Sequence, residues 1–147
     1  MAITQAIANA FKQQLLEGDH NFSNSSGDVF KLALYTSDAT LNSATTAYTT
    51  TNEVSASGEY SAGGGTLVNS GTSVVNGVAF VDFADLSFTG VTLTARGALI
   101  YNTSSATTDA AVAVLDFGSD KTATSGTFTI QFPNANDTQA IIRIGNA

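Results

Sequence analysis

The sequence predicts an all-β fold, namely a single antiparallel β-sandwich of jelly-roll-like type with one N-terminal α-helix. The chain has 147 residues, which is the size of one ordinary domain. Its second half consists of short runs of β-branched and aromatic residues, separated by clusters of Gly, Ser, Asn and Asp. Only the first segment has the apolar spacing of a helix. We therefore assign residues 1–147 to one sandwich domain.

The N-terminal segment predicts a helix from about residue 4 to residue 17. Thr4 is a suitable N-cap, and Gly18 is a suitable stop after the last turn. Three apolar residues between them recur at i, i+4 spacing: Ile7, Phe11 and Leu15. Such a stripe is typical of a helix that covers the core of its own domain.

A strand and a long loop follow the helix. Residues 29–36 are rich in strand formers, and Phe30, Leu32 and Leu34 would share one face. From about residue 37 to residue 65 the chain contains mainly Ser, Thr, Ala, Gly and Asn. Connections longer than about 12 to 15 residues are uncommon in compact domains, and they tend to be functional or ordered by assembly.

The remainder of the chain predicts antiparallel strands. Asn76-Gly77 separates strand-like residues 66–75 from residues 78–83, and this dipeptide favours a type I′ hairpin turn. Residues 127–132 alternate strictly between polar and apolar, so one face should be buried and the other wet. Further strands are expected at residues 86–88, 91–102, 111–117, 122–132 and 140–144.

Charge and composition exclude several classes of function. Twelve acidic and five basic residues give a net charge of −7, and the basic residues are scattered, so we expect no nucleic-acid partner. The N-terminus has neither a basic segment nor a continuous apolar run, so we expect no secretion signal and no membrane association. We expect the chain to be made in the cytoplasm.

No constellation of residues predicts catalysis or a cofactor. The chain has no cysteine, and its one histidine, His20, lies in a polar turn where we expect it to be solvated. Asp82 alternates with apolar neighbours in a predicted strand, so we expect it to face outward. We predict that the protein is not an enzyme, with no catalytic, cofactor-binding or metal-ligating residues.

Weak calcium binding is the one metal alternative left open. Oxygen-bearing side chains that suit calcium occur in the loops: Asp116, Asp120, Asn134, Asn136 and Asp137. Their positions beside Gly, Ser and Pro favour a simpler interpretation, in which they bond to the backbone of their own turns.

Two tyrosines make the long loop a candidate contact surface. Tyr48 and Tyr60 are rigid amphipathic side chains that can anchor an interface at low entropic cost. Packing of the loop on its own domain explains them equally well.

Several stretches of the first half resemble a small virion structural protein of tailed bacteriophages. The resemblance begins with the opening Met-Ala-Ile-Thr-Gln-Ala-Ile and the helix, and extends loosely to Arg96 and Tyr101. The resembling runs are Phe30-Lys31-Leu32-Ala33-Leu34-Tyr35-Thr36, Ala39-Thr40-Leu41, Thr45-Thr46-Ala47-Tyr48, Asn52-Glu53-Val54-Ser55 and Gly58-Glu59-Tyr60-Ser61-Ala62-Gly63-Gly64.

The resemblance implies a capsid decoration, or cement, protein. Its partners would be the major capsid protein and copies of itself in a homotrimer, on the surface of the virion capsid after assembly in the host cytoplasm. Candidate contact residues are Tyr48, Asn52, Glu53 and Tyr60. The alternatives are a tail- or neck-associated structural protein and an adhesin that binds host glycans.

Overall fold

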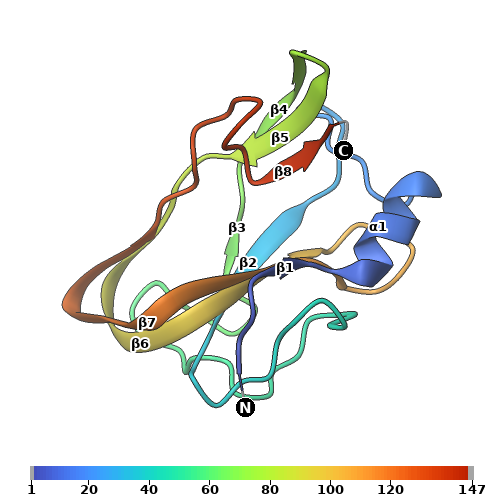
Figure 1. Cartoon of the computed structure of the whole chain (residues 1–147). Coiled ribbons are helices and arrows are strands. Elements are labelled where there is room, and N and C mark those ends of the chain that lie inside the picture. Colours follow the sequence, from blue (N-terminus) through green and yellow to red (C-terminus); the bar gives the residue numbers. More distant parts are fainter. Residues whose placement is uncertain (1, 146–147) are drawn as a thin grey trace.

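The computed structural model describes residues 2–145 and confirms the all-β sandwich with an N-terminal helix. A five-stranded antiparallel sheet has the order β1-β7-β6-β2-β3, and a three-stranded sheet has the order β4-β5-β8. In Figure 1 the three-stranded sheet lies above the five-stranded one, and α1 lies to one side. The elements are β1 (Ala6–Ile7), α1 (Asn9–Leu16), β2 (Phe30–Tyr35), β3 (Gly65–Thr66), β4 (Asn69–Val75), β5 (Val78–Phe83), β6 (Leu86–Asn102), β7 (Ala110–Ile130) and β8 (Ile142–Ile144).

The core lies between the two sheets. Phe30 of β2 and Phe83 of β5 are almost fully buried, and their ring centroids are 5.8 Å apart. On the helical side, Phe11 packs edge-on against Phe22 at 6.0 Å. These aromatic contacts join the helix, the large sheet and the small sheet into one hydrophobic core.

The helix is shorter than predicted, and its predicted start at Thr4 is wrong. α1 begins at Asn9 because the preceding residues are extended: Ile3 bridges Leu41, and β1 pairs with β7. The i, i+4 stripe is therefore divided between two kinds of structure. Ile7 belongs to a strand, whereas Phe11 is the buried residue of the helix.

Two strands are longer than predicted, and together they shape the molecule. β6 joins the predicted strands 86–88 and 91–102, while β7 joins the predicted strands 111–117 and 122–132 and ends at Ile130, two residues earlier than predicted. Irregularities in their register, including the residues between Asp116 and Lys121, bend the ribbon without ending it. Figure 1 shows the result, an arch that rises from the large sheet toward the small one.

The predicted hairpin and long loop are both present. Asn76 and Gly77 have φ angles of 50° and 77°, as a type I′ turn requires, and they join β4 to β5. The residues between β2 and β3 form only isolated bridges, so the loop expected at about residues 37–65 is largely irregular.

Candidate functional site

The long loop is held against the large sheet by backbone hydrogen bonds. The amide of Val54 donates to the carbonyl of Leu34 at 2.9 Å, and the amide of Thr36 donates to the carbonyl of Asn52 at 3.0 Å. Beyond these, the amide of Tyr48 donates to Asp109, which directly precedes β7. The loop is therefore a fixed part of the domain.

The Glu53 carboxylate organises the interior of this loop. The hydroxyl of Tyr48 donates to Glu53 Oε2 at 2.6 Å, and the hydroxyl of Tyr60 donates to Oε1 at 2.8 Å. The amide of Gly63 also donates to Oε1, at 2.7 Å. Hydrogen bonds to a charged acceptor are the stronger kind, so one side chain joins three points of the loop.

Two tyrosines of the sheet extend the network. Tyr101 of β6 donates its hydroxyl to the carbonyl of Gly63 at 2.6 Å, and its ring stacks on Tyr48 with a centroid distance of 4.7 Å. Tyr35 of β2 donates to the carbonyl of Thr49 at 2.6 Å. Burial raises the pKa of all four tyrosines, including that of Tyr101 to about 12, so the phenols stay protonated as donors.

The four predicted contact residues lie close together, but not as a common surface. Tyr60 is 0% exposed, and its hydroxyl also accepts a hydrogen bond from the amide of Leu34. Tyr48 and Glu53 are half-buried, whereas Asn52 is exposed and donates through Nδ2 to the carbonyl of Asp38. This placement favours packing of the loop on its own domain, and it removes Tyr60 from the accessible surface.

Sequence reasoning missed a regular polar surface on the β6–β7 arch. Inward-facing residues such as Phe88, Leu93 and Phe128 are buried, while the hydroxyl residues that alternate with them are exposed. We call these exposed residues the hydroxyl face: Ser87, Thr89, Thr92, Thr94, Thr122, Thr124, Thr127 and Thr129.

The hydroxyl face is fixed by pairing of its own side chains. Ser87 and Thr129 lie opposite each other with their hydroxyls 2.8 Å apart, and Thr94 and Thr122 repeat this pairing at 2.8 Å. Residues 86–95 and 122–130 contain no charged residue. The strict alternation of residues 127–132 could have revealed this face, but in the sequence it indicated only which side is buried.

The expectation that His20 is solvated is wrong. His20 is 6% exposed and lies 4.8 Å from Phe11, measured between ring centroids. Gln14 Oε1 and Asn102 Nδ2 are each 2.9 Å from one ring nitrogen, an acceptor on one side and a donor on the other. This pattern fits a neutral imidazole, and burial accordingly lowers the pKa of His20. The contacts describe a structural histidine.

The expectation that Asp82 faces solvent is also wrong. β5 is the central strand of the small sheet, and residues 80–83 are all buried, so both of its faces are covered. Asp82 is 1% exposed; Oδ1 accepts the amide of Phe83 at 2.8 Å, while Oδ2 has no hydrogen-bond partner among residues 2–145. Burial raises the pKa of this carboxyl group.

Two of the five candidate calcium ligands, Asp116 and Asn136, bond to the backbone of their own turns, and Asp137 bonds to a distant side chain. Asp116 Oδ1 accepts the amide of Gly118 at 2.8 Å and lies 3.2 Å from Arg96 Nε. Asn136 accepts two amides of the following turn, and Asp137 accepts Asn76 Nδ2 at 2.9 Å. Within residues 2–145, no three His, Asp or Glu side chains gather as metal ligands would.

Comparison with models of known protein families, with curated proteins and with solved structures finds no match to this chain. No helix within the described residues has the length and hydrophobicity needed to cross a lipid bilayer.

Proposed function

We propose that the protein is a structural component of a tailed-bacteriophage virion that binds the assembled head shell as a decoration protein. The observation that carries this proposal is the hydroxyl face, a regular uncharged surface on paired strands. Although the chain carries a net charge of −7, such a surface brings no charged residue of its own strands into direct contact with a large assembly. The resemblance to small virion proteins supports the same conclusion.

The binding mechanism is mass action on a repeated surface. A module that binds the assembled shell better than the free subunit stabilises the shell by that difference in affinity. Copies of the chain in a homotrimer would bind several capsid subunits at once, so each contact can be modest. The fixed loop contributes by keeping each module rigid, because a rigid surface loses little entropy when it docks.

Gold-labelled antibodies against the recombinant chain, imaged on purified phage particles, test the position in the virion. We expect label over the head, with copies on the order of hundreds per particle, as a repeated shell contact requires. Label confined to the tail or neck would contradict the decoration role, and particles without the chain would contradict the virion role altogether.

A pair of variants tests the surface. Thr124→Glu places a charge on the hydroxyl face, whereas Thr40→Glu adds the same charge at an exposed loop position. We expect Thr124→Glu to lower occupancy on particles and Thr40→Glu to retain it. Equal occupancy would show that the hydroxyl face is not the contact.

A further inference from the structure

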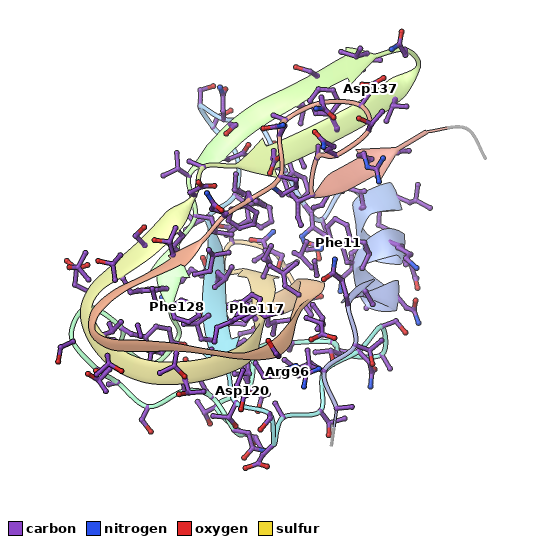
Figure 2. The ribbon with its side chains drawn as sticks, turned by 60° about the vertical axis from the view of Figure 1, so that its left-hand side comes forward. Phe11, Arg96, Phe117, Asp120, Phe128 and Asp137 are labelled. Carbon is purple, nitrogen blue, oxygen red and sulfur yellow. The ribbon has the colours of Figure 1, made fainter. Side chains whose placement is uncertain are left out.

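The β6–β7 arch is open on one side. A groove of about 770 Å³ lies there, between the two limbs of the bent strand β7 and residues 139–143. Phe117 and Phe128 face each other inside the arch from opposite limbs, with ring centroids 6.1 Å apart (Figure 2). Leu115, Phe132 and Ile141 add apolar surface and are only partly buried. The hydrophobic core is therefore accessible from this side.

The two outer edges of the arch differ. Along β6, loop residues cover the edge: Thr89 exchanges two hydrogen bonds with Glu59, and the amide of Thr92 donates to Ser57 Oγ at 2.9 Å. Along β7, the partner strand β1 pairs only with Ala113 and Val114. Within the described residues, no strand pairs with the outer edge of β7 from residue 115 to residue 130.

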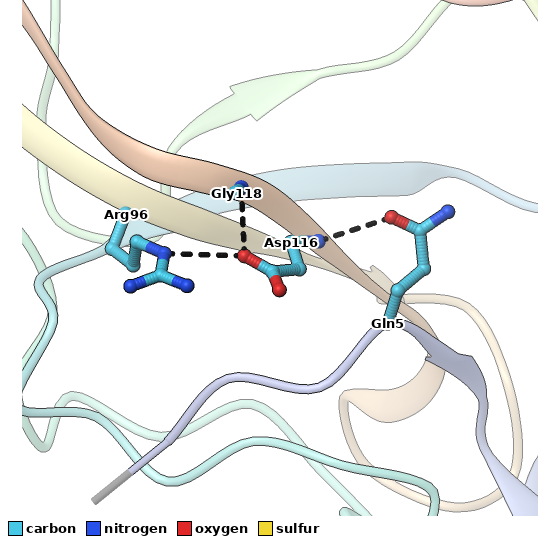
Figure 3. Close-up of polar contacts among 4 residues, drawn as sticks. All are labelled: Gln5, Arg96, Asp116 and Gly118. Carbon is cyan, nitrogen blue, oxygen red and sulfur yellow. Dashed lines mark hydrogen bonds and ion pairs between the residues drawn. The ribbon is translucent and has the colours of Figure 1, made fainter.

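One side chain marks where a further strand would fit. Gln5 lies just before β1, and its Oε1 accepts the amide of Asp116 at 3.2 Å (Figure 3). A side-chain carbonyl thus occupies the position that a strand carbonyl would take next along β7. Residues 127–133 continue this edge and line the groove without interruption. An edge of this kind is a template for an added strand.

Basic side chains line the groove of an acidic protein. Lys121 and Arg143 approach it from β7 and β8. Asp116 is the only acidic residue in the lining, and it is paired with Arg96 at 3.2 Å. Two further carboxylates lie beside the groove without being part of its lining: Asp120, which is exposed next to Lys121, and Asp85, whose Oδ1 accepts the amide of Phe132 at 2.8 Å. Three of the five basic residues of a chain with net charge −7 therefore lie at or beside this groove.

We propose that the groove binds an extended acidic peptide segment of a partner protein, which adds a strand to the outer edge of β7. Its backbone would pair with residues 127–130, and alternate apolar side chains would enter the groove toward Phe117. Its carboxylates would lie near Lys121 and Arg143, which would give the site its preference for acidic sequences. This inference goes beyond the proposed function, because it concerns the isolated chain whether or not the chain joins a particle.

The test uses the full chain and three synthetic fluorescent peptides of about ten residues. In the first, valine alternates with serine and glutamate stands at both ends; in the second, lysine replaces glutamate; in the third, prolines interrupt the acidic peptide. Fluorescence anisotropy should show the acidic peptide binding at least about tenfold more tightly than the lysine peptide. The proline peptide should not bind, because proline cannot donate to a strand ladder.

Two matched charge reversals locate the site. Lys121→Glu should weaken binding of the acidic peptide about tenfold, whereas Lys12→Glu, on the exposed side of α1, should leave it unchanged. Amide exchange should show new protection in residues 126–131 when the peptide binds.

Three results would overturn the inference: no binding of the acidic peptide, equal binding of the acidic and lysine peptides, or protection elsewhere in the chain. Sedimentation of the free chain tests whether a second copy of the chain occupies the groove. Self-association that Lys121→Glu abolishes would show that a second copy fills the groove instead.

Discussion

The long loop and the β6–β7 arch use polar residues in opposite ways. In the loop, which has almost no regular structure, the polar groups of Tyr48, Tyr60 and Gly63 bond to Glu53 and are turned inward. In the arch, which is regular, the hydroxyls face solvent, and within the part of the chain that the structure describes the outer edge of β7 lacks a strand partner along most of its length. The irregular loop is therefore closed, in the sense that its polar groups bond to one another. The regular arch is open, because it presents its hydroxyls and a strand edge to solvent.

The largest expected difference in stability is between alanine variants of two glycines that have nearly the same backbone conformation. Gly64 of the loop has φ +78°, and Gly118 of the arch has φ +81°. A Cβ on Gly64 would lie 1.7 Å from the carbonyl oxygen of Leu32, whereas a Cβ on Gly118 would meet nothing within 4 Å. Both alanine variants carry the left-handed cost of about 1 to 2 kcal/mol, but only Gly64→Ala adds a clash with backbone.

Urea unfolding measures this contrast. We expect Gly118→Ala to remain folded with a slightly lower midpoint, and Gly64→Ala to lose at least about 4 kcal/mol or to fail to fold. Similar midpoints for the two variants would mean that the loop yields easily and is not closely packed on β2.

The second comparison is between the losses of stability that follow when one carboxylate is removed from the loop and one from the arch. Glu53→Ala leaves two hydroxyls and an amide without their acceptor, so we expect a loss of about 3 kcal/mol in the free energy of unfolding. Asp116→Ala removes an acceptor at the more exposed arch, where we expect at most about 1 kcal/mol. Equal losses in denaturant unfolding would contradict the distinction between the regions.

Alkaline pH should weaken the closed region. Burial, aided by Asp109 and Glu53, raises the pKa of Tyr101 from 10.0 to about 12. Between these values the unfolded chain has released this proton and the folded chain has kept it, so stability is complete below pH 10 and is lost as the pH rises. Each such tyrosine contributes a slope of about 1.4 kcal/mol per pH unit.

Tyr101→Phe isolates this contribution. The variant should be less stable than the parent chain at pH 7, because the hydrogen bond to Gly63 is lost. Its stability should fall less steeply between pH 10 and pH 12. Denaturant midpoints over this range measure both effects, and parallel curves for the two proteins would show that Tyr101 ionises alike in both states.

Local patterns in the sequence predicted the local structure well. The Asn76-Gly77 turn, the strand at residues 78–83 and the alternation of residues 127–132 all depend on neighbouring residues, and all are present. The long loop was likewise recognisable from its composition.

Features that depend on distant residues were not predictable. The helix begins late because Ile3 and β1 pair with Leu41 and β7, which no local pattern reveals. His20 is buried because Asn102, far along the chain, bonds to its ring. No pattern in the sequence indicated that three groups of the loop would donate hydrogen bonds to the carboxylate of Glu53. The open edge of β7 likewise follows from how briefly β1 pairs with it.

Residue-resolved amide hydrogen exchange of the free chain tests the contrast between the closed loop and the open arch most directly. We predict that the loop amides of Val54 and Gly63 exchange as slowly as those of β2, because each donates to a fixed acceptor. The amides of residues 127–130 that point away from β6 should exchange fast. Rapid exchange throughout the loop, together with full protection along the outer edge of β7, would contradict the account.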